Sequence, residues 1–73
     1  MKIRIKFKKE KHLNDVLSSE HIKHFDYDVF DERTIVINFD WLSGDSKSLQ
    51  LNKVGIGKLL FSYQYIEYYF IEK

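Results

Sequence analysis

The stretch KIRIKFK, residues 2–8, decides the fold class because its polarity alternates at every step. Its apolar side chains are Ile3, Ile5 and Phe7, and the basic row between them consists of Lys2, Arg4, Lys6 and Lys8. Strict alternation is the period of a strand that buries one face and exposes the other. The stretch therefore predicts a half-buried strand whose outer face is a row of cations.

Downstream of this strand the period of the apolar residues changes. Leu13, Val16 and Leu17 fall at helical spacing, which predicts one amphipathic helix over residues 10–22. Alternation then returns, and residues 25–39 are expected to form a hairpin whose turn is Asp31-Glu32-Arg33. The chain thus begins with a strand, a helix and a pair of antiparallel strands.

The second half of the chain predicts further strands separated by glycine-containing loops. Residues 43–46 form the clearest loop, a strand is expected from about 49 to 54, and residues 55–57 predict a turn. Residues 59–71, rich in Tyr and Phe, favour a last strand with a bulge or sharp twist near 66–67. We therefore predict a single α+β domain over residues 1–73. Its expected order is β-α-β-β-β-β, with one helix packed on one face of a largely antiparallel four- to five-stranded sheet.

Composition limits the classes of function that the chain can have. It contains no cysteine, which excludes disulfides, thiolate metal sites and a cysteine nucleophile. It also contains no alanine or proline, a bias that suggests a low-GC genome such as that of a bacterium, phage or mobile element. No apolar run approaches the roughly 18 residues that a membrane helix needs, so we expect a cytoplasmic protein without membrane association.

The net charge of +1 hides a strong segregation along the chain. Residues 1–12 hold six basic side chains and one acid, whereas residues 13–45 hold eight acids and two basic side chains. Such polarised segments either recognise a partner or neutralise each other in the fold.

The basic row has three interpretations. Its spacing of about 6.6 to 6.8 Å is close to the phosphate repeat of an extended nucleic acid strand. The row could instead form cross-strand ion pairs with Asp26 and Asp28, or it could protect an edge strand from aggregation. Placement of Asp26 and Asp28 on the same face as the row would favour internal neutralisation and protein binding, whereas opposite faces would favour nucleic acid.

The acidic hairpin is a candidate partner-binding site made of Asp26, Asp28, Asp31 and Glu32. A calcium loop is excluded because Phe30 and Asp31 replace the required oxygen ligand and glycine and no helix flanks the run. Carboxylates about 7 Å apart on a strand could instead occupy a basic groove that normally holds phosphates. A solvated hairpin face is the alternative.

A second candidate partner-binding set is aromatic, and it consists of Trp41, Tyr63, Tyr65 and Tyr68. Tyr and Trp anchor protein interfaces and also stack on nucleic acid bases. Alternatively, these side chains cover a small core with their polar ends in water. Both interpretations stay open from sequence alone.

Catalytic and metal-binding patterns are weak throughout the chain. His21 and His24 share a helical spacing, but no third metal ligand follows at a telling distance. The segment Gly55-Ile56-Gly57-Lys58 lacks the outer glycine and the Ser or Thr of a phosphate loop. We therefore predict no enzyme, no metal and no cofactor.

These observations favour a small non-enzymatic protein-binding module. Its most concrete form is a stoichiometric inhibitor or regulator, of the phage or mobile-element type, that binds a host protein acting on nucleic acid. The alternative is a small nucleic-acid-binding domain that uses the basic row and the C-terminal tyrosines. A homodimer stays open.

Overall fold

The computed structural model describes residues 1–72 and contains a four-stranded antiparallel sheet, here called sheet A. Its central strand β1 (Lys2–Phe7) pairs with β3 (Thr34–Asn38) on one side and β7 (Ile66–Glu72) on the other. The short strand β2 (Tyr27–Val29) pairs with β3 and forms the far edge. The first strand is therefore central, and the interpretation of its lysines as edge protection is wrong.

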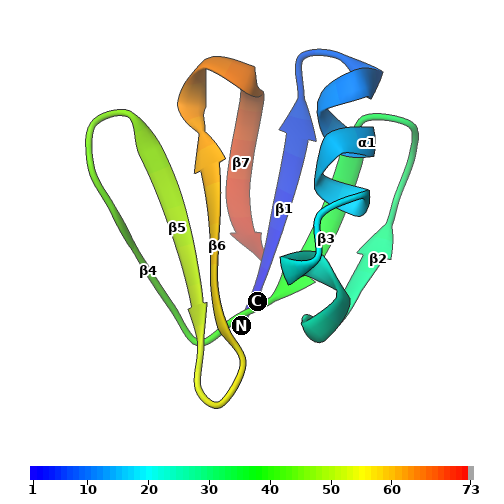
Figure 1. Cartoon of the computed structure of the whole chain (residues 1–73). Helices are drawn as coiled ribbons and strands as arrows, with labels where there is room; N and C mark the ends of the chain where they lie inside the picture. Colours follow the sequence, from blue (N-terminus) through cyan, green and yellow to red (C-terminus); the bar gives the residue numbers. More distant parts are fainter. Residues whose placement is uncertain (73) are drawn as a thin grey trace.

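A second antiparallel sheet, sheet B, contains three strands in the order β4 (Trp41–Gly44), β5 (Ser48–Lys53) and β6 (Gly57–Ser62). Figure 1 shows sheet B on the left, β1 and β7 in the middle and the helix α1 on the right. The predicted α+β class with one α-helix is confirmed for the described residues. The predicted single sheet of four to five strands is only roughly matched, because four strands form sheet A and three more form sheet B.

The strands divide between two sheets because the residues that face the core switch between odd and even positions at two places in the chain. Ile35 and Ile37 point into the core from odd positions, but Leu42 packs against it from an even one. Phe61 and Ile66 show the same change, and the 3₁₀ turn η2 (Tyr63–Tyr65) separates them. Side chains of a strand alternate between its two faces, so neither pair can lie in one straight strand and stay buried.

The helix is shorter than its sequence pattern predicts. α1 (Glu10–Leu17) buries Leu13, and it ends at Ser18, whose hydroxyl donates to the carbonyl oxygen of Asn14 at 2.9 Å. Serine hydroxyls compete for helix carbonyls in this way and favour termination. A separate 3₁₀ turn, η1 (His21–His24), follows, so the predicted helix over 10–22 consists of two elements.

The predicted hairpin is confirmed, with β2 and β3 joined by a turn over residues 30–33. The predicted loop at 43–46 is only partly correct, because Ser43 and Gly44 belong to β4. Gly44 has a φ of 124°, and a Cβ atom there would clash with the carbonyl oxygen of Ser48. The turn thus requires glycine at this position.

The core lies between the inner face of sheet A, sheet B and α1. Its buried apolar side chains are Ile3, Ile5, Phe7, Leu13, Ile22, Phe25, Ile35, Ile37, Phe39, Leu49, Leu51, Leu59, Phe61 and Ile66. All three apolar residues of the opening stretch are among them, as its alternation predicts. Across residues 1–72, every helix is too short or too polar to cross a lipid bilayer.

Candidate functional site

The outer face of sheet A, opposite the side covered by α1 and sheet B, carries the predicted basic row. Arg4 lies between Val36 of β3 and Phe70 of β7, and Lys6 lies beside Tyr68. Directly paired residues of an antiparallel sheet point to the same side. We call this surface the aromatic–cationic face, and it consists of Lys2, Arg4, Lys6, Phe30, Tyr68 and Phe70.

Two of the three cations of this face, Arg4 and Lys6, are paired with acids of β7. The Arg4 Nε atom lies 2.9 Å from the Glu72 carboxylate, and the Lys6 Nζ atom lies 3.8 Å from Glu67. Arg33 also reaches Glu67, at 3.8 Å. Both acids come from the C-terminal segment, which sequence reasoning treated only as an aromatic strand. The face is therefore not a bare cationic surface.

The aromatic rings of the face pack on the cations yet remain open to solvent. The guanidinium carbon of Arg4 lies 4.1 Å from the ring centroid of Phe30, and Lys6 Nζ lies 5.9 Å from that of Tyr68. Phe30 is 63% exposed, Tyr68 46% and Phe70 47%. Exposed aromatic groups in contact with charged groups are typical anchors of protein interfaces.

The predicted acidic hairpin lies at the β2 edge of the same sheet. Asp28 pairs in register with Val36, which also pairs with Arg4, so Asp28 points to the side of the cations. Asp26 shares that side by alternation along the strand. Within residues 1–72 neither acid forms an ion pair with the row. Of the two alternatives, the shared face is the one present, but the acids that pair with the row are Glu67 and Glu72.

The other two acids of the hairpin have different environments. The Asp31 carboxylate accepts a hydrogen bond of 2.8 Å from the backbone N–H of Arg33, and this bond holds the pKa of Asp31 below its ordinary value. Asp31 therefore closes the turn between β2 and β3. Glu32 is exposed at the tip of the turn.

The four predicted aromatic residues do not form one surface. Tyr68 belongs to the aromatic–cationic face, whereas Trp41 lies on the edge strand of sheet B. Tyr63 packs near Tyr69, and the Tyr65 ring stacks on His12 with centroids 4.3 Å apart. Sequence position alone could not separate these environments, because the 3₁₀ turn η2 redirects the chain. Lys8, the last member of the basic row, lies beyond β1 and is exposed.

The two edges of sheet A differ sharply in character. β2 has three residues and carries Asp28, whereas β7 has seven residues, of which four in succession are large, apolar and at least 38% exposed. These four are Tyr68, Tyr69, Phe70 and Ile71. Short, charged edges resist strand pairing, and long apolar edges favour it. Tyr68 and Phe70 belong to the aromatic–cationic face, whereas Tyr69 and Ile71, which pair with Ile5 and Ile3, point to the opposite side of the sheet.

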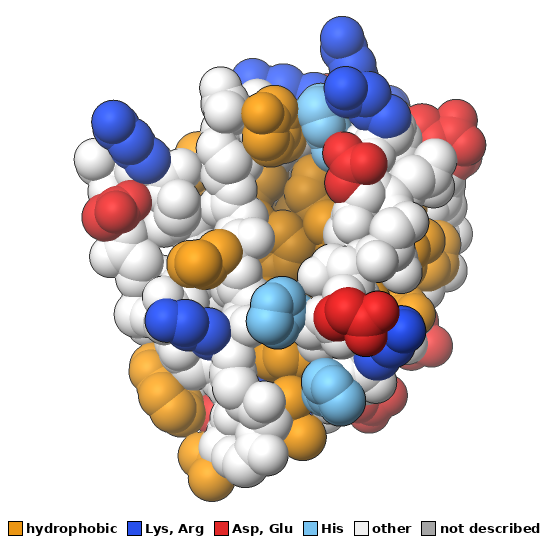
Figure 2. All heavy atoms as spheres, in the orientation of Figure 1, with side chains coloured by type: hydrophobic (Ala, Val, Ile, Leu, Met, Phe, Trp, Pro, Cys, Tyr) orange, Lys and Arg blue, Asp and Glu red, His pale blue; other side chains and the backbone are white. Residues whose placement is uncertain are grey.

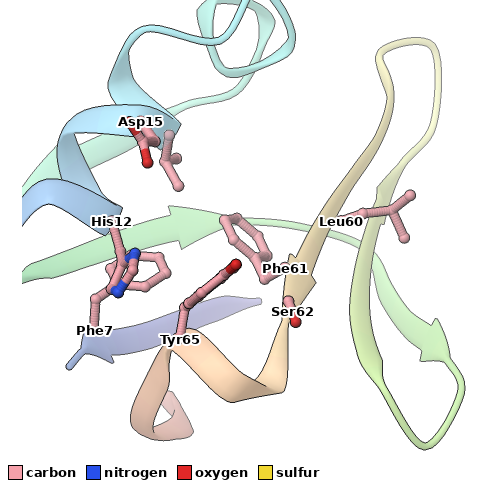
Figure 3. Close-up of a pocket in the computed structure, with 8 residues that line it drawn as sticks. Phe7, His12, Asp15, Leu60, Phe61, Ser62 and Tyr65 are labelled. Atoms are coloured by element: carbon pink, nitrogen blue, oxygen red, sulfur yellow. The ribbon is translucent and has the colours of Figure 1, made fainter. Parts of the chain in front are cut away.

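A second candidate site is a groove between α1 and β6 that sequence reasoning missed. It encloses about 280 Å³, with Phe7, Val16 and Phe61 among its apolar lining. His12 and Asp15 of α1 line it together with Ser62 and Tyr65. Figure 2 shows this side of the molecule hollowed, with apolar side chains in the floor, and Figure 3 shows His12 and Tyr65 beside each other. The feature of the sequence that could have indicated this groove is the spacing of His12 and Asp15, which lie about one helical turn apart.

Among the side chains of residues 1–72, no group of three or more potential metal ligands comes together. His21 and His24 both lie on η1. The chain matches no family model, no curated protein and no solved structure at a significant level.

Proposed function

We propose that this chain is a protein-binding module that uses the aromatic–cationic face of sheet A. The observation that supports this proposal most strongly is the contrast between the charges and the rings on that face. Arg4 and Lys6 are neutralised by acids of their own chain, whereas Phe30, Tyr68 and Phe70 remain exposed. A protein partner covers exposed rings favourably and does not require free cations.

Nucleic acid fits this surface less well. Binding to a phosphate backbone depends on free Lys and Arg side chains that displace counterions. Arg4 and Lys6 are paired with carboxylates, and Asp26 and Asp28 add further negative charge on the same side. A phosphate strand along the row would meet these acids at close range, so electrostatic repulsion opposes the nucleic-acid alternative.

The more specific form of the proposal is a stoichiometric inhibitor or regulator of a host protein that acts on nucleic acid. Its support is the acidic hairpin, where Asp26 and Asp28 lie on one strand side without ion pairs to the rest of residues 1–72. A basic groove that normally holds phosphates would accept such carboxylates. The low-GC composition suits a phage or mobile-element protein acting in bacterial cytoplasm.

The test is an affinity capture from a low-GC bacterial lysate with three forms of the chain. The wild type is compared with Phe30→Ser/Tyr68→Ser/Phe70→Ser and with the matched control Trp41→Ser. Trp41 is 49% exposed but lies on β4 of sheet B and is not part of the aromatic–cationic face. We expect one partner to be recovered in stoichiometric amount by the wild type and the control, and to be lost with the triple variant.

A parallel arm measures fluorescence anisotropy of labelled single- and double-stranded oligonucleotides at low salt. We expect no saturable binding. Tight binding that weakens steeply with salt would overturn the proposal in favour of the nucleic-acid alternative. Equal capture of the same partner by the triple variant would also overturn it, because the face would then contribute nothing.

A further inference from the structure

The groove between α1 and β6 has an unpaired strand along one wall. Within residues 1–72, β6 is an edge strand of sheet B, paired with β5 only. The groove is lined by β6 on one side and α1 on the other, and Figure 3 shows the open space between the two elements. The free edge of β6 therefore borders the groove.

The backbone groups that β6 presents there follow from the hydrogen bonding of β5. The Asn52 carbonyl oxygen accepts a bond of 2.8 Å from the Asp40 N–H, so even-numbered residues of β5 face β4. Leu51 then faces β6, where its partner is Leu59. Hydrogen-bonding direction alternates along a strand, so Leu60 directs its N–H and C=O away from β5 and toward the groove.

Apolar side chains form the floor beneath this free edge. Phe7 and Phe61 are buried core residues whose ring centroids lie 6.0 Å apart, and Val16 lies beside them on α1. Tyr65 adds a further ring at the open end, stacked on His12. An apolar side chain placed over this floor would join the existing core.

The groove is closed at its other end. The 3₁₀ turn η1 lies against β6 there. An adjoining hollow at that end is lined by His21 of η1 and by Lys58 and Leu60 of β6. Lys58 forms no ion pair with any other residue of 1–72. This hollow therefore offers a cation and an imidazole, whereas the carboxylate that lines the main groove, Asp15, lies on α1 outside the hollow.

We propose that this groove binds the extended C-terminal tail of a partner protein as a fourth strand of sheet B. Alternating free N–H and C=O groups are satisfied by an extended backbone, and a strand added to an exposed edge is an established mode of peptide recognition. A closed groove admits a chain end. Antiparallel pairing with β6, the arrangement throughout sheet B, brings the tail's carboxylate to Lys58 and His21, where the charges are complementary.

The pairing also fixes the side-chain pattern of the tail. When the last residue of the tail pairs with Leu60, the residue before it pairs with Phe61 and points to the same inner side. That penultimate side chain enters the floor of Phe7, Val16 and Tyr65 and should be apolar. The last side chain points outward, beside the exposed Leu60, and is less restricted.

The test uses an array of peptides randomised in their last four positions, synthesised with free carboxyl ends and again as C-terminal amides. We expect labelled wild-type protein to select apolar residues at the penultimate position only in the free-acid array. Amidation of a selected peptide should weaken binding about tenfold or more, because a charge-assisted contact is lost. Equal binding of the acid and amide forms would overturn the proposal.

Variants of the groove provide a second measurement with the best selected peptide, by fluorescence polarisation. Leu60→Pro removes the N–H on the free edge of β6 without removing a hydrogen bond to β5, and we expect it to abolish peptide binding. The control Leu60→Thr keeps this N–H and should bind the peptide. Lys58→Gln should weaken peptide binding at least fivefold. The control Lys47→Gln lies outside the groove and should bind the peptide with wild-type affinity. Both changes are at the surface, so the variants should fold. Wild-type affinity for the peptide in both Leu60→Pro and Lys58→Gln would refute the proposal.

This groove opens on the side of α1, away from the aromatic–cationic face. Peptide binding in the groove and partner binding on that face can therefore be refuted independently of each other. The Phe30→Ser/Tyr68→Ser/Phe70→Ser variant should bind the selected peptide with wild-type affinity. Loss of peptide binding in that variant would contradict the placement of the tail in the groove.

Discussion

Arg4 is the residue through which the neutralisation of the aromatic–cationic face can be measured. Its guanidinium contacts the Glu72 carboxylate at 2.9 Å and the Phe30 ring at 4.1 Å. The Arg4 and Glu72 side chains are 22% and 28% exposed, so solvent screens the pair only in part. We expect the ion pair to contribute about 0.5–1 kcal/mol and the ring contact about 0.5–1 kcal/mol to the free energy of unfolding.

The perturbation is a double-mutant cycle of Arg4→Met and Glu72→Gln, followed by urea unfolding monitored through Trp41 fluorescence. Arg4→Met keeps most of the aliphatic packing and should cost about 1–2 kcal/mol, equivalent to roughly 4–16 °C in Tm for a domain of this size. The coupling energy between the two changes should be about 0.5–1 kcal/mol and should shrink in 1 M NaCl. Lys8→Met serves as the control, because Lys8 forms no ion pair within residues 1–72.

A coupling energy indistinguishable from zero at low salt would refute the reasoning. The Arg4 side chain would then be free in solution, and the row would present mobile cations to a phosphate backbone. In that case Glu72→Gln would leave oligonucleotide binding unchanged, whereas removal of a neutralising acid should otherwise strengthen any such binding.

Three further predictions concern stability. Gly44→Ala should destabilise the domain by about 2 kcal/mol or more in urea unfolding, and Gly55→Ala by about 1 kcal/mol, because both glycines have positive φ but only the first lacks space for a Cβ atom. Equal losses of stability in the two variants would contradict the predicted clash of a Cβ atom at Gly44. The Asp40 carboxylate accepts the Val54 N–H at 2.7 Å, and this bond lowers the pKa of Asp40 below its ordinary value of 3.8. Asp40→Asn should therefore lower Tm at pH 7, with the difference from wild type disappearing as pH falls below about 3.8, and a constant difference would argue against this assignment. Asn52→Ala should cost about 1–3 kcal/mol in urea unfolding, since the buried amide donates two hydrogen bonds to β4, and a cost near zero would show that those bonds contribute little.

The local parts of the fold were predictable because they depend on short periods in the sequence. The alternation of Ile3, Ile5 and Phe7 correctly predicted a strand with one buried face. The turn at Asp31 was predictable from its residue types, and the structure shows the side-chain bond that closes it. These features need only neighbouring residues, so a single sequence contains the information.

The division into two sheets was not predicted, since it depends on contacts between distant segments. The bulge predicted near residues 66–67 is present, because β7 shifts its register there: Tyr68 pairs with Lys6, but Ile66 pairs with Phe7. The 3₁₀ turn η2 before it, and the passage of the chain from one sheet to the other, were not predicted. Only the pairing of β7 with β1 reveals that Glu72 meets Arg4, 68 positions earlier in the chain.

The same limit applies to the candidate sites. The basic row was identified, and its common face with Asp28 was one of two stated alternatives. The exposed Phe30 and Phe70 were not among the predicted residues, because exposure depends on which strand lies at the edge. The groove was missed entirely, since it combines Phe7, α1 and β6 from separate parts of the chain.

The most direct measurement is isothermal titration calorimetry of the captured partner against the wild type, the Phe30→Ser/Tyr68→Ser/Phe70→Ser variant and Trp41→Ser. Loss of three exposed anchors should weaken binding at least 100-fold, with little dependence on salt, while Trp41→Ser binds as the wild type does. Wild-type affinity of the triple variant, or loss of binding in Trp41→Ser alone, would contradict binding through the aromatic–cationic face.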